Sequence, residues 1–275
     1  TNVEELEYAE NATFQYYSGY EVLDVSPSDV FSAAEFNWKQ AAVNVTASGL
    51  ETRIQNAGAE RVIPLLEKRI KNAEKTMANN ISEGVYSDGT GSGGKQIGGL
   101  QSIIADAGTG TVGGIDSSTF TFWKNQTSGD VASIDTSAAL LDAEMKNMWL
   151  ETCRGNDKCD LIVSDQTLYK VFWDNLSDIQ RITGADEGVQ GFNSLKFVTA
   201  DVVMDGGPAI HNSGIPATHM YFLNTDYLYF KIHDDTNFVP FEQRVPVNQD
   251  ALVVPILFAG NMTCSNRSLQ GVVYT

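Results

Sequence analysis

The stretch VIPLLEKRIKNAEKTMANNISEGVYSDGTGSGG, residues 62–94, combines a long helical pattern with an abrupt glycine-rich end, and these two features decide the fold. Its apolar residues recur three or four positions apart and so share one face of an α-helix. They are Val62, Leu66, Ile70, Ala73, Met77 and Ile81. Glutamate, lysine and arginine fill the other face, and Pro64 lies in the first turn, where proline is tolerated. The pattern predicts an amphipathic helix over 59–85 that is solvated on one side.

The residues that follow, YSDGTGSGGKQIGGL (86–100), match two phosphate-loop patterns, G-x-G-x-x-G and G-x-x-x-x-G-K. Phosphate loops follow a buried strand and precede a helix, and Ser or Thr comes after the lysine. Here a helix precedes the loop and Gln96 follows Lys95. The context favours a flexible linker, and a phosphate-binding enzyme that uses residues 89–95 is the alternative from another class. The candidate hinge positions are Gly89, Gly91, Gly93, Gly94, Gly98 and Gly99.

The first 48 residues predict a long two-stranded ribbon. Apolar and polar residues alternate around Leu6 and Phe36, and Ala41, Val43 and Val45 continue in the opposite phase, as after a bulge. An isolated ribbon is marginally stable in water, so we expect this one to lie on another subunit. The candidate interface residues are Tyr16, Tyr17, Tyr20, Phe36 and Trp38. For each of them, packing within one subunit is the alternative.

The rest of the chain alternates helical and strand patterns. A helix capped by residues 135–137 extends to about Cys153, a short strand covers 161–163, and a second helix begins near Gln166. Strand-like segments cover 195–204, 219–232 and 251–260. This order predicts an α+β chain whose first half is completed by its C-terminus.

Composition limits the classes of function. The chain carries a net charge of −17, which argues against direct binding to nucleic acid phosphates. No apolar run approaches the ~18 residues of a membrane span, so we expect no membrane partner. Cys153 and Cys159 are the two ends of the stretch CRGNDKC, and free thiols are favoured there over a disulfide. The chain begins at Thr1 without an apolar leader, which suggests a trimmed or processed N-terminus.

No catalytic, metal or cofactor site is expected. His211, His219 and His233 lack metal-ligand spacing with the cysteines. The sequence has no G-x-S-x-G motif to present a nucleophile, and its acidic residues are scattered. The protein is therefore not expected to be an enzyme.

Eight segments carry a family resemblance that covers nearly the whole chain. They are YAENATFQYYSGYEVLDVSPSDVFSAAEFNWKQAAVNVTASGLE, RIKNAEKTMANNISEGVYSDGTGSGGKQIGGLQSIIAD, TGTVGGID, FTFWKNQ, CRGNDKCDLIVSD, ADVVMDGG, HMYFLNTDYLYF and FAGNMTCSNRSLQGVV. In this order they resemble the tailed-bacteriophage major capsid proteins that have the Hong Kong 97 phage capsid fold.

The resemblance implies a domain plan. Residues 1–48 would form an N-terminal strand and the E-loop, a ribbon that reaches over a neighbouring subunit. Residues 49–111 would form the peripheral (P) domain around the spine helix, and 112–225 the axial (A) domain. Residues 226–275 would return to the P domain.

The resemblance also implies a function: self-assembly into hexamers and pentamers of an icosahedral head around double-stranded DNA. Portal and scaffolding proteins, and possibly a decoration protein, would be partners. The protein would be assembled in the host bacterial cytoplasm and located in the virion capsid. An encapsulin-like compartment of the same fold is the alternative. Crosslinking of Lys39 to Asn261 or Asn266 is not expected, because no matching motif supports it.

Overall fold

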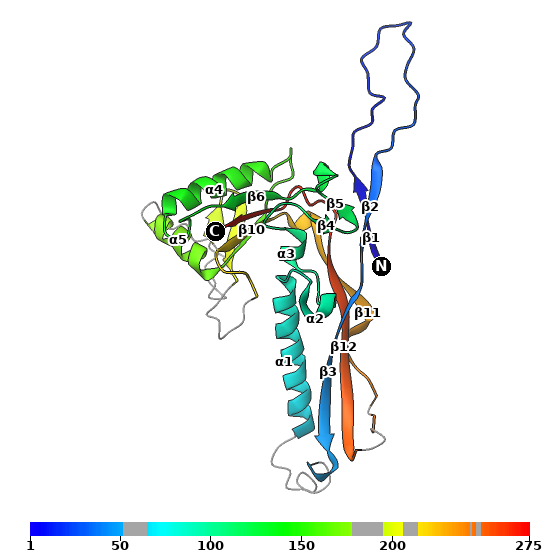
Figure 1. Cartoon of the computed structure of the whole chain (residues 1–275), viewed down its shortest axis with the longest axis vertical. Coiled ribbons are helices and arrows are strands. Elements are labelled where there is room, and N and C mark those ends of the chain that lie inside the picture. The colour runs from blue at the N-terminus through cyan, green and yellow to red at the C-terminus, as the bar shows by residue number, and fades with distance from the viewer. Residues whose placement is uncertain (52–64, 178–194, 206–213, 243, 246–248) are drawn as a thin grey trace.

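The computed structural model describes residues 1–51, 65–177, 195–205, 214–242, 244–245 and 249–275. Figure 1 shows an elongated molecule with three parts: a thin ribbon at one end, a long sheet with one helix at the other, and a broader helix-and-sheet body at the side. The chain mixes helices and strands throughout, so the predicted α+β class is confirmed.

The long sheet contains three antiparallel strands from distant parts of the sequence, in the order β11-β12-β3. These strands are β3 (Lys39–Ser48), β11 (Leu228–Pro240) and β12 (Ala251–Cys264). The pairing of β12 with β3 is continuous from Ala251↔Ser48 to Gly260↔Lys39. The C-terminal part of the chain therefore completes the first half, as predicted.

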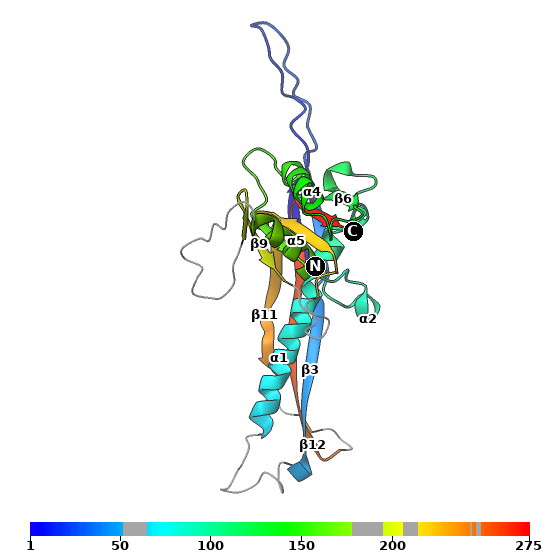
Figure 2. The same ribbon diagram turned by 90° about the vertical axis from the view of Figure 1, so that its left-hand side faces the viewer.

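One long helix, α1 (Leu65–Val85), covers one face of the long sheet, as Figure 2 shows. Its Ala73 and Met77 pack on buried apolar residues of the sheet, namely Val45, Val254, Ile256 and Phe258. The predicted helical face is thus the buried one. Residues 59–64 of the predicted helix lie outside the described residues.

A six-stranded sheet, in the order β6-β13-β10-β7-β9-β8, forms the side body. Its strands are β6 (Gln126–Asp130), β7 (Leu161–Ser164), β8 (Leu195–Phe197), β9 (Ala200–Met204), β10 (His219–Leu223) and β13 (Gly271–Tyr274). Two helices, α4 (Ala138–Glu151) and α5 (Gln166–Ser177), pack with one face of the sheet. The predicted Ser137 cap is present, since its side chain accepts a hydrogen bond from the Leu140 amide.

The central strand β10 explains why this body has two apolar layers. Met220 and Phe222 belong to the cluster beneath α4 and α5, whereas Tyr221 and Leu223 belong to a second cluster on the opposite face. The second cluster includes Trp123, at the end of the short helix η2 (Thr121–Trp123). A strand buried on both faces reads as continuously apolar, as HMYFL does.

The ribbon is shorter than the sequence predicts. Strands β1 (Asn2–Glu7) and β2 (Phe31–Phe36) pair antiparallel, from Asn2↔Phe36 to Glu7↔Phe31. Strand β3 leaves the ribbon and pairs with β12, so the change of phase after Trp38 marks the move from one sheet to another and not a bulge within a ribbon.

The C-terminal segment divides between the two sheets. The resemblance implies that residues 226–275 belong to the P domain; β11 and β12 lie in the long sheet, and β13 lies between β10 and β6 in the six-stranded sheet. The last residues are apolar and enter a sheet that buries both faces, so Val272 and Val273 are fully buried.

Two chain passages connect the sheets side by side: η4 (Thr225–Tyr227) between β10 and β11, and residues 265–270 between β12 and β13. The backbone of Asn224 and the side chain of Gln270 exchange two hydrogen bonds of 3.0 Å each. The Ser265 amide donates to the Tyr227 carbonyl at 3.0 Å. The passages are thus bound to each other.

Arg267 holds the second passage against the adjacent core. Its side chain is fully buried, and its guanidinium donates to the carbonyls of Ile103 and Trp123. Burial disfavours the charge and lowers the pKa of Arg267 to about 10. The arginine therefore serves as a multiple hydrogen-bond donor for loop carbonyls.

The glycines after α1 differ in how closely they are packed. A side chain added at Gly99 would place its Cβ 2.3 Å from the Val85 carbonyl oxygen, so only glycine fits beside the end of α1. At Gly98 the nearest atom would be 3.6 Å away, an ordinary contact.

We expect Gly99→Ala to destabilise the protein by about 1–3 kcal/mol, because the backbone of α1 would have to shift. The matched control is Gly98→Ala, which we expect to be close to neutral. Urea unfolding followed by circular dichroism measures both variants. Equal stabilities of the two would show that the close approach at Gly99 is not a constraint.

Candidate functional site

The most unusual surface of the molecule is the tip of the ribbon, residues 8–30, which projects beyond the body (Figure 1). Its large apolar side chains are exposed; Tyr16 is 92% and Val25 91% exposed, and Tyr20 is fully so. The others are Phe14, Tyr17, Val22 and Leu23. Soluble monomers rarely expose a contiguous apolar surface of this kind, which indicates a protein-protein contact.

Charge divides the ribbon into segments. Residues 1–38 contain no lysine or arginine, and acidic residues are spread along both arms. Residues 12–20, ATFQYYSGY, carry no charge at all and contain four aromatic rings, as their letters show. This uncharged aromatic segment is the part of the ribbon that can be desolvated at the lowest cost.

The predicted interface residues fall into two groups. Tyr16, Tyr17 and Tyr20 lie exposed at the tip, where an adjacent molecule can reach them. Phe36 is only 7% exposed and belongs to the core beneath the ribbon, and Trp38 is half-buried with its ring edge-on to His233 at 5.6 Å. For Phe36 the structure supports the alternative, packing within one subunit, because β2 turns this ring inward.

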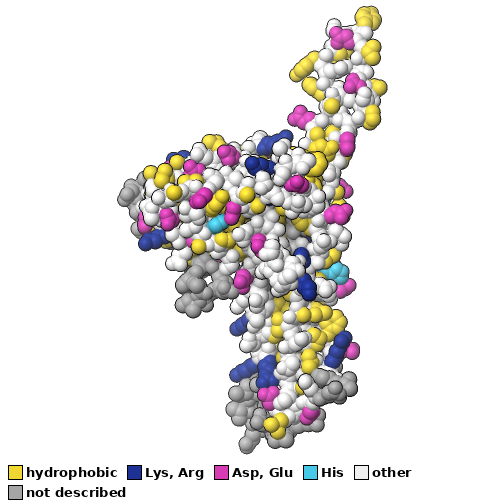
Figure 3. Space-filling model, in the orientation of Figure 1, with side chains coloured by type: hydrophobic (Ala, Val, Ile, Leu, Met, Phe, Trp, Pro, Cys, Tyr) yellow, Lys and Arg dark blue, Asp and Glu magenta, His cyan; other side chains and the backbone are white. Residues whose placement is uncertain are grey.

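A second unpaired surface is the face of the long sheet opposite α1, which sequence reasoning did not single out. Residues 40–48 and 251–264 contain no charged side chain. Since Val254, Ile256 and Phe258 face α1, strand alternation places Val253 and Leu257 on the other face, where both are half-buried. Figure 3 shows apolar side chains gathered over β11 and β12 beside α1.

The edge strand β11 carries further exposed apolar side chains on both faces of the sheet: Val239 pairs with Leu257 on this face, whereas Phe230 stacks on Phe258, which faces α1. Tyr229, Phe230, Ile232, Val239 and Phe241 are each between 36% and 41% exposed. Among the described strands, β11 pairs only with β12, so its other edge has no strand partner. An edge strand presents unpaired backbone groups to other chains, although β11 also carries Lys231, Asp234 and Asp235. The signal available in the sequence was the lack of charge in residues 40–48 and 251–264, whereas β11 carries these three charged residues.

The glycine-rich loop uses its amides within the chain. The Thr90 amide donates to the Asp88 carboxylate at 2.9 Å, the Gly94 amide to the Thr90 carbonyl at 3.0 Å, and the Gly98 amide to the Asn261 side chain at 3.0 Å. A phosphate loop directs such amides toward its ligand. The four-residue turn α2 (Gly91–Gly94), which contains left-handed residues, follows α1 without an intervening strand.

Lys39 and Asn261 are both engaged within the subunit. The Asn261 side chain is buried and donates to the Asn37 carbonyl at 2.8 Å while it accepts from Gly98. The Lys39 ammonium donates to the Gly94 carbonyl. These contacts join the glycine-rich loop to the start of β3.

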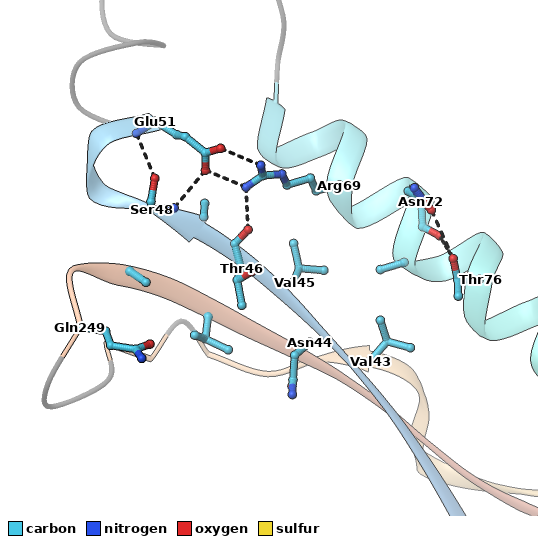
Figure 4. A pocket seen from close by; sticks show the side chains of 14 residues that line it. Val43, Asn44, Val45, Thr46, Ser48, Glu51, Arg69, Asn72, Thr76 and Gln249 are labelled. Atoms are coloured by element: carbon cyan, nitrogen blue, oxygen red, sulfur yellow. Dashed lines mark hydrogen bonds and ion pairs between the residues drawn. The ribbon is translucent and has the colours of Figure 1, made fainter.

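A hollow of about 630 Å³ lies between the end of β3, α1 and residues 249–253 (Figure 4). Its charged groups are matched: the Arg69 guanidinium donates to both carboxylate oxygens of Glu51, at 2.8 and 2.9 Å, and to the Thr46 carbonyl at 2.7 Å. These bonds lower the pKa of Glu51 to about 2. The pair therefore fastens β3 to α1 and leaves no unmatched charge for an anionic ligand.

Neither a metal cluster nor a membrane helix is found in the described part of the chain. Its His, Cys, Asp and Glu side chains form no group of three or more that could hold a metal ion. None of its helices is both long and apolar enough to cross a bilayer.

All three cysteines are free, as favoured from the sequence. Burial raises the pKa of the Cys159 and Cys264 thiols to about 12, whereas Cys153 is half-buried, and burial also raises its pKa.

We expect an Ellman assay at pH 8 to titrate at most one thiol in the folded protein, Cys153, and all three in guanidinium. Cys153→Ser should remove the native signal; reaction of a second thiol without unfolding would contradict the described burial.

Comparison with known proteins supports the fold. No protein-family model matches the sequence, and no curated protein matches it significantly. Among solved structures, the SrpI encapsulin complex from Synechococcus elongatus PCC 7942 matches with a TM-score of 0.60 and 6% identity, over 99% of this chain and 81% of that chain. The capsid of Myoviridae phage XM1 matches at 0.58 and 10%, over 99% and 83%.

A chain of Mycobacterium phage Bobi also matches, at a TM-score of 0.58 and 11% identity, over 100% of this chain and 85% of that chain. The three neighbours cover almost every element described above, from the ribbon to β13. Identities of 6–11% support a statement about fold and not about activity. The chain therefore has the Hong Kong 97 capsid fold.

Proposed function

We propose that the protein is the major capsid protein of a tailed double-stranded DNA bacteriophage. In this role copies associate into hexamers and pentamers, which close into an icosahedral head around the genome. The fold, the exposed ribbon and the sequence resemblance to tailed-phage capsid proteins support the proposal. The mechanism is assembly and not turnover, and no residue is assigned a catalytic role.

The observation that carries the proposal is a pair of matching surfaces at opposite ends of one molecule. The uncharged aromatic segment 12–20 projects from one end, and the long sheet, whose residues 40–48 and 251–264 are uncharged, lies toward the other (Figures 1 and 3). Because they are far apart within a copy, they can meet only between copies. Such a contact joins two different surfaces, and repetition of it around an axis closes a ring.

The domain plan follows from this proposal. The E-loop corresponds to β1, β2 and the tip between them, and the P domain to α1 with the long sheet. The A domain corresponds to the six-stranded sheet with α4 and α5, including β13. Portal and scaffolding proteins, and possibly a decoration protein, are the further partners that such a head requires.

The acidic charge suits a container for DNA. With a net charge of −17 per copy, the shell repels phosphates and limits non-specific adhesion of the genome to its wall. The genome is then enclosed without sequence-specific binding, and the mature location is the virion capsid after assembly in the host cytoplasm.

An encapsulin-like compartment is the second candidate, since an encapsulin complex is among the structural neighbours. The two candidates share the shell and differ in its contents. A phage head encloses DNA, whereas a compartment encloses cargo protein. The sequence segments that resemble tailed-phage capsid proteins favour the first candidate.

The test is to purify particles from the native source and to image them by negative stain. We expect closed shells built of this chain that contain nuclease-protected double-stranded DNA. Shells filled with protein in place of DNA would support the encapsulin-like alternative. A chain that stays monomeric at high concentration, and that ATP or NAD stabilises against thermal unfolding, would instead support the phosphate-binding enzyme.

A further inference from the structure

The base of the ribbon is held on its inner face by the turn of a small hairpin, formed by β4 (Thr111–Val112) and β5 (Ile115–Asp116). The Glu35 amide of β2 donates to the Gly113 carbonyl in the turn at 2.9 Å. Val112 and Ile115 share one apolar cluster with residues of the ribbon base, namely Leu6, Ala34 and Phe36. The hairpin thus contacts the ribbon through both backbone and side chains.

The fit at Gly113 is tight. A Cβ added there would lie 2.8 Å from the Ala34 Cβ and 3.2 Å from the Phe36 ring, so the ribbon rests directly on the glycine backbone. Gly113 also has φ +60°, in the left-handed region. Gly114 has φ +79° but no atom within 4 Å of its added Cβ. Both glycines therefore have the left-handed backbone that favours glycine, and of the two only Gly113 touches the ribbon.

The hairpin is fixed to the body from behind. The Trp123 indole, 1% exposed, donates to the Val112 carbonyl at 2.9 Å. Next to it, the Phe122 ring stacks on Tyr8 at 5.0 Å, just beyond the end of β1. On another strand, the Lys231 ammonium pairs with the Glu4 carboxylate at 2.5 Å. The described supports therefore reach as far as Tyr8, and the tip extends freely from there.

We infer that the hairpin turn at Gly113 is the seat that sets the direction in which the ribbon leaves the subunit. Gly113, Ala34 and Phe36 are positioning residues of this seat. The tip is long and lacks support, so a small change in angle at the seat becomes a large displacement at Tyr16 and Tyr20. The inference rests on the proposed function for its consequence, since the direction of the ribbon decides where it meets a neighbour.

The test compares Gly113→Ala with Gly114→Ala as its matched control. Both substitutions place alanine at a left-handed position, and only the first presses on the ribbon. Spin labels at Ser18→Cys in the tip and Asn147→Cys on α4, in a Cys153→Ser background, report the distance from tip to body by pulsed electron resonance. The measurement is made on the unassembled chain.

We expect Gly113→Ala to shift the mean label distance beyond the width of the parent distribution, and Gly114→Ala to leave it unchanged. Adding Ala34→Gly to Gly113→Ala removes the closest opposing atom and should restore the parent distance, even if the single variant folds poorly. Equal distances in both alanine variants, or no restoration in the double variant, would overturn the inference.

This experiment separates the seat from the shell. If the parent chain never forms particles but Gly113→Ala shifts the label distance, the proposed function fails and the seat stands. If particles form and the distance does not respond, the seat fails and the function stands. Where both hold, Gly113→Ala should lower the yield of closed shells relative to Gly114→Ala.

Discussion

We expect the joint replacement of Tyr16, Tyr17 and Tyr20 with serine to abolish the proposed closed shells while the subunit remains folded. The three rings are exposed and make no contact with the core, so their removal costs the monomer little. In an interface, a buried tyrosine that acts as a hot spot contributes about 2 kcal/mol or more to the free energy of binding. Every copy in the shell would lose three such tyrosines. Size-exclusion chromatography with negative-stain imaging measures the loss, and circular dichroism checks the fold.

The matched control replaces the same three tyrosines with phenylalanine. This variant keeps the aromatic area and loses only the hydroxyls, so we expect shells to form. Closed shells from the serine variant, in parent yield, would show that the aromatic tip is not the contact between copies. Failure of both variants would assign the contact to the tyrosine hydroxyl groups.

Trp123→Ala should destabilise the subunit by about 3–5 kcal/mol, a large part of the ~5–15 kcal/mol that holds a typical domain folded. The indole is almost fully buried in the cluster that joins the ribbon base, the hairpin and β10, and its N–H satisfies the Val112 carbonyl. Alanine leaves a cavity and an unsatisfied carbonyl. The measurement introduces Trp123→Ala into the variant whose three tip tyrosines are serine and compares denaturant unfolding with and without the substitution. We expect this background not to assemble, so the difference is the stability of the subunit alone.

Trp173→Ala is the control for the loss of a tryptophan. Trp173 lies on α5 at 36% exposure and contacts Tyr169 edge-on at 5.9 Å. We expect it to cost about 1 kcal/mol. Similar losses at the two positions would mean that the ribbon-side core is not closely packed around Trp123.

Elements with strong periodicity were predictable from the sequence. The stripe through Ala73 and Met77 predicted α1, and Ser137 predicted the start of α4, because helix periodicity and capping are local signals. Pairing between distant strands is not local. The sequence therefore placed β3 in the ribbon, whereas β3 pairs with β12, and it did not predict that β13 pairs with β10 and β6.

The candidate site was predictable in part. Aromatic residues without helical spacing indicated an arm that needs a partner, and Tyr16, Tyr17 and Tyr20 lie on its exposed tip. Phe36 belongs to the same arm but faces inward, because strand alternation gives the two faces of a ribbon different neighbours. The glycines after α1 predicted a flexible linker, with a phosphate-binding loop as the alternative, and neither interpretation anticipated the close packing of Gly99 against the end of α1.

The paired passages at Asn224 and Gln270 have a mechanical consequence. A domain that is attached through a single chain segment can rotate about that segment. Here the six-stranded sheet is joined to the long sheet by two passages that are bonded to each other, together with the chain that leaves α1. Torsion between the two sheets would have to break buried hydrogen bonds, so the subunit transmits a twist applied at one end to the other.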